Sequence, residues 1–369
     1  MQTLTSAPPI TEQLETMRNF FRTGDTKSYA FRKEQLLKLR MAVMQQEKAL
    51  YDALLADLKK NPEESWVTEI GFFISEINAT IKNLQQWMRP EKVKTNLVNM
   101  PSSSYVLHEP LGVVLIIAPW NYPFQLLFTP LIGAIAAGNC VVLKPSEFAV
   151  ETAAVMKKII QQTFAEVYIL YVEGDGAVIV PEMMNNFIFD HVFYTGSTAV
   201  GKIIYQMAAK NVVPVTLELG GKSPCVVETD ANIKVAAKRI AMTKFSNAGQ
   251  MCVSPDYLLV HHSIKDAFVA ELKKNIKNFF SDDPSEDYNY GKIINERQFN
   301  RLISYLHEGK ILHGGNFDVK KLYIEPTIIT DILPGSPLLR DEIFGSPAPG
   351  RRPAIDRLVV SHGFAPCNP

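Results

Sequence analysis

One cysteine and one glutamate stand in segments that suit covalent chemistry. Cys252 follows the small, flexible run Asn-Ala-Gly-Gln-Met. An ionised thiol is a strong nucleophile, and a turn of small residues lets a substrate and backbone N–H groups approach it closely. Glu218 ends the apolar run Val-Thr-Leu and stands just before Leu-Gly-Gly. A carboxylate at the point where a strand runs into a turn suits a general base. The two segments together predict a thiol nucleophile with a base.

The two segments resemble the motifs of the aldehyde dehydrogenase superfamily. The family's glutamate stands in Glu-Leu-Gly-Gly-Lys-Ser, found here from Glu218 to Ser223, and its nucleophile ends Asn-x-Gly-Gln-x-Cys, found here from Asn247 to Cys252. The separation of 34 residues from Glu218 to Cys252 also fits that family. The resemblance implies that the Cys252 thiolate attacks an aldehyde and that Glu218 activates the water that hydrolyses the resulting thioester.

A third candidate lies in the rigid turn Ala-Pro-Trp-Asn-Tyr-Pro, which ends at Pro123. This turn holds the Asn121 amide beyond the end of an expected strand, and an amide N–H aimed at a developing oxyanion stabilises it. Taken alone, an asparagine here equally satisfies turn geometry. By resemblance, Asn121 and the backbone N–H of Cys252 stabilise the oxyanion, and the neighbouring Trp120 contacts the cofactor.

The segment Leu-Lys-Pro-Ser-Glu, which ends at Glu147, suits the ribose of a dinucleotide. Lys144 can donate to ribose hydroxyls and Glu147 can accept from them, while a carboxylate there disfavours the extra phosphate of NADP. In isolation the segment passes as an ordinary solvated turn. The family places the adenosine ribose at these positions, so NAD is the expected cofactor, with NADP also possible.

Two more segments resemble cofactor motifs of the family. The run from Tyr194 to Gly201 follows an expected strand and opens a helix, whose free N–H groups attract phosphate; the residues involved are Gly196, Ser197 and Gly201. In Asp-Glu-Ile-Phe-Gly, which ends at Gly345, the resemblance assigns Glu342 and Phe344 to the nicotinamide ribose and ring, and it also assigns Leu219 to the cofactor. The seven histidines have no ligand-like spacing, so no metal is predicted.

The elements that must position these residues follow an α/β pattern. Alternating strands and helices imply a parallel sheet covered by helices, with ligands bound at the carboxyl ends of the strands. We therefore expect two α/β domains, which by resemblance are a Rossmann-like cofactor domain and a catalytic domain. The polar segment of residues 94–109 predicts a hairpin. By resemblance it is a projecting oligomerisation hairpin, whereas on sequence alone it could equally be a surface hairpin. The expected strands of the sheet are Gly112–Ala118, Cys140–Leu143, Val167–Tyr171, His191–Tyr194 and Val213–Glu218.

The expected domains follow from these patterns and from the resemblance. Helical spacing over Lys33–Asn61 predicts part of an N-terminal helical region. Leu111 to Leu143 has no charged residue, but its three prolines leave pieces too short for a membrane span, so it is read as a buried βαβ core. The predicted divisions are residues 1–93 (helices), 94–109 (hairpin), 110–219 (NAD-binding domain), 220–345 (catalytic domain, incomplete) and 346–369 (tail).

Composition limits the expected binding partners and the expected cellular location. The 369 residues include 38 Lys and Arg and 38 Asp and Glu, so the formal net charge is zero, and no broad surface for nucleic acid or anionic lipid is expected. The four cysteines form no metal or disulfide pattern, which favours a reducing cytoplasm. The N-terminal residues lack the basic region and apolar core of a secretory signal.

Details of the motifs look most like the class 3 and fatty-aldehyde branch. Its members are typically homodimers that use NAD, sometimes NADP, on medium-chain, long-chain or aromatic aldehydes. After Gly345 the resemblance stops: the family continues with Pro and a further stretch, whereas residues 346–369 carry five prolines, which leave little room for a regular helix or strand. We therefore expect a truncated or frame-shifted gene product that is poorly soluble or not a native dimer, with weak or no activity.

Two alternatives stay open from the sequence. One is an acylating dehydrogenase that passes the acyl group to coenzyme A, a reaction that does not need Glu218 as a water-activating base. The other is an inactive remnant that only binds the cofactor or has a structural role.

Overall fold

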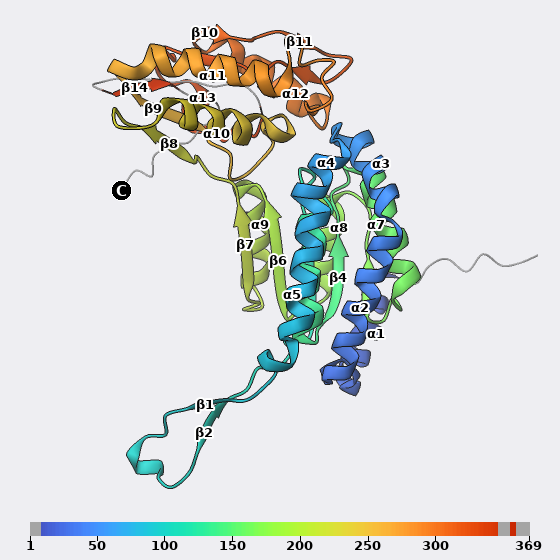
Figure 1. The fold of residues 1–369 in the computed structure, drawn as a ribbon. Coiled ribbons are helices and arrows are strands. Elements are labelled where there is room, and N and C mark those ends of the chain that lie inside the picture. Colours follow the sequence, from blue (N-terminus) through green and yellow to red (C-terminus); the bar gives the residue numbers. More distant parts are fainter. Residues whose placement is uncertain (1–8, 346–354, 359–369) are drawn as a thin grey trace, which may run out of the picture. The chain divides into compact units, whose positions relative to one another are not determined.

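The computed structural model describes residues 9–345 and the backbone of residues 355–358 (Figure 1). These residues divide into two compact units. Unit 1 contains the described residues up to Ala53 together with Ser65–Glu218. Unit 2 contains Leu54–Glu64 and the described residues from Leu219 onward. Residues 54–64 therefore belong to the second unit although they come early in the chain.

A five-stranded sheet forms the centre of unit 1, in the order β5-β4-β3-β6-β7. β3 pairs in parallel with both β4 and β6, and β4 pairs in parallel with β5. The chain fills one side of β3 and then crosses to the other, so the switch point of the topology lies between β3 and β6. The strands are β3 (Val113–Ile117), β4 (Cys140–Lys144), β5 (Ile169–Tyr171), β6 (His191–Gly196) and β7 (Val215–Leu219).

The residues of the central strands explain their position. All residues of β3 and β4 are buried, as expected for Val- and Ile-rich strands that helices cover on both faces. Each of the five predicted strands agrees with the observed one to within two residues at either end. The predicted α/β fold class is confirmed, and the uncharged run from Leu111 to Leu143 is the buried unit β3-α6-β4.

Helices connect the strands of this sheet. α6 (Gln125–Ala137) packs against β3 and β4, α7 (Val150–Thr163) against β5, and α9 (Thr198–Ala209) against β6, while α8 (Gly176–Asn186) links β5 to β6. The N-terminal helices include α1 (Ile10–Thr23), α2 (Tyr29–Gln45) and α5 (Gly71–Trp87). The single helical stretch expected over Lys33–Asn61 is in fact α2 followed by α3 (Glu47–Leu58), because the backbone leaves the helical region at Gln46.

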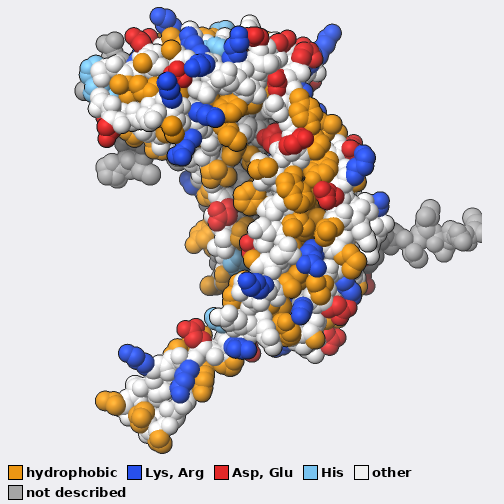
Figure 2. Space-filling model, in the orientation of Figure 1, with side chains coloured by type: hydrophobic (Ala, Val, Ile, Leu, Met, Phe, Trp, Pro, Cys, Tyr) orange, Lys and Arg blue, Asp and Glu red, His pale blue; other side chains and the backbone are white. Residues whose placement is uncertain are grey.

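A two-stranded antiparallel hairpin extends from the end of α5 (Figure 1). Its strands are β1 (Glu91–Val93) and β2 (Ser104–Val106). Figure 2 shows hydrophobic side chains gathered at its far end, where Leu97 and Val98 are 89% and 92% exposed.

Unit 2 has a smaller sheet in the order β14-β9-β8, with β8 (Pro224–Val227) parallel to β9 (Tyr257–His261). α10 (Ile233–Phe245) packs on α11 (Lys265–Phe280), and their apolar faces join β8 and β9 in one buried core. The other elements are α4 (Pro62–Ser65), most of which lies in this unit, α12 (Glu296–Ser304), α13 (Pro337–Arg340), the pair β10 (Lys310–His313) and β13 (Ile328–Thr330), and the pair β11 (Phe317–Asp318) and β12 (Tyr323–Ile324).

The prediction that the tail leaves little room for a regular strand is wrong for four residues. β14 (Ile355–Leu358) pairs antiparallel with β9, with Ile355 opposite His261 and Leu358 opposite Leu258. The sequence from Ala354 to Ala365 contains no proline, so its backbone N–H groups are available to a neighbouring strand. Residues 346–354 and 359–369 lie outside the described residues, as does the rest of the prediction about the tail.

Across residues 9–345 and 355–358, no helix is both long enough and apolar enough to cross a membrane. In the same part of the chain, His, Cys, Asp and Glu side chains do not gather in groups of three or more that could hold a metal ion.

Candidate active site

In unit 1 the candidate residues lie at the carboxyl ends of the strands. Asn121 follows β3, Glu147 follows β4, Gly196 and Ser197 follow or end β6, and Glu218 is the penultimate residue of β7. Because these strands run in parallel, the five residues share one edge of the sheet, where ligands of such folds bind. Chain topology thus brings together residues that are almost a hundred positions apart.

A buried carboxylate holds the end of the turn that contains Asn121. Asn121 is 1% exposed. Four residues later α6 begins, and Glu69, which is fully buried, accepts the backbone N–H groups of Phe124 (2.9 Å) and Gln125 (3.2 Å). These are first-turn amides that have no acceptor within the helix, and a negative charge there is also favoured by the helix dipole. Glu69 therefore anchors the end of the turn that carries Asn121.

Lys144 and Glu147, the predicted ribose-binding residues, contact each other, and the Glu147 carboxylate is held in place. Glu147 Oε1 accepts the Gly176 N–H at the start of α8 (3.1 Å), and Glu147 Oε2 lies 3.2 Å from Lys144 Nζ. Burial acts to raise the pKa of Glu147, but the N–H groups of Glu147 and Gly176 and the Lys144 ammonium outweigh it, so the pKa is lowered. Lys144 is 1% exposed and also donates to the Pro145 carbonyl (2.6 Å). Its ammonium therefore holds Glu147 in place.

The phosphate candidate is a tight helix start. A Cβ atom on Gly196 would lie 2.3 Å from the Tyr194 hydroxyl, so a larger residue there would have to displace the Tyr194 side chain. That hydroxyl donates to the Ser197 carbonyl (3.2 Å), and the Ser197 side chain caps α9 by accepting the Val200 N–H (3.4 Å). Ser197 and the following residues of the first turn are exposed, so this helix start is open to an anion from solvent.

Glu218 lies on β7, the edge strand of the sheet, and is exposed. β7 is tied to its neighbour β6 by a side-chain contact of 3.0 Å between His191 Nε2 and Thr216 Oγ1. This contact helps to hold β7, the strand that carries the Glu218 carboxylate, in the sheet.

In unit 2 the half-buried Cys252 follows a turn with an unusual backbone. Asn247, Ala248 and Gly249 are consecutive residues with φ of 50°, 51° and 79°, in the left-handed region. Such conformations persist only where the surroundings fix them. Gln250, which is fully buried, is one such support: its amide donates to the carbonyls of Asn247 (2.9 Å) and Lys292 (3.0 Å) and accepts the Ile294 N–H (3.1 Å).

The Glu342 segment packs against two glycine turns of the same unit. The Glu342 carboxylate accepts the Gly221 N–H (3.3 Å), and a Cβ atom on Gly220 would lie 1.8 Å from it. At the other end, a Cβ atom on Gly249 would lie 2.7 Å from the Gly345 carbonyl oxygen. The Gly-Gly turn after Leu219, the cysteine turn and the segment with Glu342 and Phe344 therefore meet within unit 2.

Three basic side chains, Arg301, Lys244 and Lys222, lie around this meeting point. Arg301 on α12 donates to the Glu342 carbonyl (3.4 Å) and to the Ile343 carbonyl. The completely buried Lys244 donates to the Gly345 carbonyl (3.3 Å), and burial lowers its pKa. Burial raises the pKa of Glu342, against the opposing effects of the Gly221 N–H and of Arg301, Lys222 and Lys244. The segment is thus clamped through its backbone, and its carboxylate is partly desolvated.

Sequence reasoning missed several of these supporting residues. These residues stand in ordinary helical or turn patterns: Glu69, Gly176, Lys244 and Arg301. The only sign of a supporting role that the sequence offered was a charged residue on the buried side of a helix. The assigned roles of the twelve predicted site residues remain predictions; the structure gives their positions and their neighbours within each unit.

Comparisons with known proteins agree on one family. A model described as the aldehyde dehydrogenase family matches residues 4–348. The 4,4'-diaponeurosporen-aldehyde dehydrogenase of Staphylococcus aureus is 46% identical, over 91% of this chain and 73% of that protein. The dimeric NADP-preferring aldehyde dehydrogenase of Rattus norvegicus is 43% identical, over 92% and 75%. A substrate-bound structure of Staphylococcus aureus AldH superimposes with a TM-score of 0.90 at 45% identity, covering 93% of this chain and 75% of that one.

Proposed function

This chain belongs to the aldehyde dehydrogenase family, and on that premise we propose that it oxidises an aldehyde to a carboxylic acid through a thioester on Cys252. The resemblance inferred from the motifs is confirmed at the level of the family. The observation that carries the proposal lies within unit 2, where the left-handed turn before Cys252 abuts Gly345, the last residue of the motif that contains Glu342 and Phe344.

The chain's own residues divide the work. The Cys252 thiolate attacks the aldehyde carbon, and the resulting thiohemiacetal oxyanion accepts hydrogen bonds from the Asn121 amide and the Cys252 N–H. The cofactor, when bound, supplies the acceptor for the hydride that leaves this carbon. Glu218 then takes a proton from water as the water attacks the thioester, which releases the acid and restores the thiolate. The burial of Asn121 and the exposure of Glu218 suit a fixed donor and a base with access to water.

The residues of unit 1 fit a nicotinamide dinucleotide. Glu147 has its carboxylate fixed and its pKa lowered, so it is ready to accept from two ribose hydroxyls. Gly196 and the first turn of α9 suit the diphosphate, and the resemblance gives Trp120, Gly201 and Leu219 further contacts. In unit 2, Glu342 and Phe344 hold the nicotinamide ribose and ring. Glu147 favours NAD over NADP, although a relative from Rattus norvegicus is named as NADP-preferring.

The substrate class and assembly follow the same branch of the family. The substrate is a medium- or long-chain aliphatic aldehyde or an aromatic aldehyde, and the setting is the cytoplasm. The hairpin suits a homodimer contact, because Leu97 and Val98 at its end are almost fully exposed and a second copy would bury them.

A thiol variant tests the proposal. Cys252→Ala is expected to abolish aldehyde-dependent NADH formation while NAD still binds, measured by cofactor fluorescence; turnover at the wild-type rate would overturn it. The assay run with and without coenzyme A separates hydrolysis from acyl transfer. Glu218→Gln is expected to stop the reaction at the thioester, seen by mass spectrometry as an acylated Cys252.

A further inference from the structure

We propose that Glu64 is a positioning residue for the nucleophile, holding the turn before Cys252 by accepting the backbone N–H of Asn247. The inference rests on the proposed function, since it assigns Glu64 to the presentation of the thiol. Glu64 Oε1 lies 2.8 Å from Asn247 N, although 183 residues separate them in the chain. Both residues belong to unit 2.

The turn needs such a support. Asn247 and Ala248 both have φ near +50°, and the left-handed region is unfavourable for residues with a Cβ atom, more so for Ala248 than for Asn247. Asn247 is fully buried, so its N–H must find an acceptor within the protein. A carboxylate is a strong acceptor, because a hydrogen bond to a charged group is shorter and stronger than one between neutral groups.

The two ends of the Asn247 backbone are held by different partners. Its carbonyl accepts from Gln250, through the backbone N–H (3.0 Å) and through the side-chain amide (2.9 Å). Its N–H is held by Glu64. Gln250 therefore holds the exit of the turn and Glu64 holds its entry, so removing Glu64 takes away the carboxylate that holds the Asn247 N–H.

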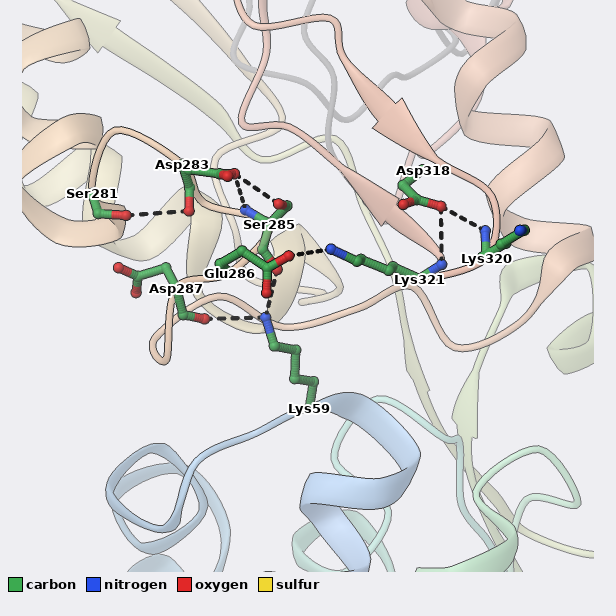
Figure 3. Close-up of polar contacts among 9 residues, drawn as sticks. All are labelled: Lys59, Ser281, Asp283, Ser285, Glu286, Asp287, Asp318, Lys320 and Lys321. Carbon is green, nitrogen blue, oxygen red and sulfur yellow. Dashed lines mark hydrogen bonds and ion pairs between the residues drawn. The ribbon is translucent and has the colours of Figure 1, made fainter.

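Glu64 is itself rigidly placed. The Asn61 side chain accepts the Glu64 N–H (2.7 Å) and donates to the Tyr288 carbonyl (3.3 Å). Lys59 extends the attachment, as Figure 3 shows: its ammonium donates to the carbonyls of Ser285 and Asp287, each at 3.1 Å. The segment that carries Glu64 is thus tied to the loop after α11 and supports the cysteine turn from a fixed position.

Removing the acceptor tests the role. In Glu64→Leu we expect kcat for aldehyde oxidation to fall about 10- to 100-fold, as when a reacting group is displaced by about an ångström, with NAD binding unchanged. Hydrogen–deuterium exchange should accelerate in the peptide that spans residues 246–252 and in few others. The rate of Cys252 alkylation by iodoacetamide, which needs neither cofactor nor turnover, should change in parallel.

Matched variants separate positioning from general damage. Glu64→Gln keeps an acceptor oxygen at the same place and should restore most of kcat and of the exchange protection. Glu63→Leu removes a carboxylate from the neighbouring exposed position, which contacts Tyr288 at the surface, and should leave both readouts unchanged. If Glu64→Leu does not fold, Glu64→Asp, which withdraws the carboxylate by one methylene, should show the same losses in smaller measure.

Three results would overturn the inference: wild-type exchange and alkylation in Glu64→Leu or Glu64→Asp, a loss in Glu64→Gln equal to that in Glu64→Leu, or an equal loss in Glu63→Leu. Absence of aldehyde oxidation by the wild-type chain would instead refute the proposed function. The exchange and alkylation measurements still decide the role of Glu64 in that case.

Discussion

The Lys222 ammonium lies 2.7 Å from the Asp256 carboxylate, and the two side chains are 5% and 0% exposed. Lys222 also donates to the Leu338 carbonyl (3.2 Å) and lies over the Tyr257 ring. Burial lowers the pKa of Lys222, while Asp341 and Glu342 act to raise it, and the contact with Asp256 favours the charged form in the same sense. Lys222 directly follows the Gly-Gly turn that Glu342 contacts.

Breaking this pair should destabilise unit 2. Asp256→Asn leaves a buried ammonium without its counter-charge, which we expect to lower the free energy of unfolding by about 3–5 kcal/mol. Urea denaturation followed by circular dichroism measures it. The exposed pair Lys277–Asp282 is the control: Asp282→Asn should change stability by less than about 1 kcal/mol. Equal effects at the two sites would contradict the prediction.

Glu69 should stabilise the start of α6 through its charge. In Glu69→Gln one buried side chain loses the negative charge that two helix-terminal N–H groups share. We expect a loss of about 1–3 kcal/mol in the free energy of unfolding, with a fall in kcat because the Asn121 turn is less well fixed. Glu76→Gln, on the exposed face of α5, should be neutral. Unchanged stability and kcat in the Glu69 variant would show that its charge is not used.

Glu147 should set the cofactor preference. Glu147→Gln keeps the shape of the side chain but removes the charge that repels a ribose phosphate, so affinity for NADP should rise relative to NAD. Parallel fluorescence titrations of the two cofactors measure the ratio. A wild-type chain that binds NADP more tightly than NAD would mean that the carboxylate does not face the ribose.

Cofactor binding should weaken in acid through Glu342. In the proposed site the ionised carboxylate is a stronger acceptor for ribose hydroxyls than the protonated acid, so NAD affinity should fall as the pH drops through the pKa of Glu342. Burial raises that pKa, with Gly221 N–H, Arg301, Lys222 and Lys244 opposing. The fall should therefore begin at a higher pH than for an ordinary glutamate. Calorimetric titration at several pH values tests this, and Glu342→Gln should bind weakly with no such dependence; an identical profile in that variant would assign the effect elsewhere.

Local patterns in the sequence predicted the parallel sheet and the edge at which the candidate residues lie. They did not predict the contacts that hold the turns in place. The strands β3 and β4 are readable because unbroken runs of Val, Ile and Leu have few alternatives to a buried strand. Contacts such as Gly221 with Glu342 join residues 121 positions apart, and no local period encodes them. β14 was missed because its place depends on the edge that β9 offers. The proline count of the surrounding residues carried no information about that edge.

The early position of residues 54–64 affects how the protein is made. Unit 1 is complete once Glu218 has left the ribosome, yet Glu64 must wait for Asn247, and Lys59 for Asp287. At a synthesis rate of about 5–20 residues per second, the 183 residues from Glu64 to Asn247 take on the order of 10–40 s. During that interval residues 54–64 lack their later partners, in a nascent chain whose first unit can already fold. The turn before Cys252 is therefore assembled late, from an early and a late part of the translated message.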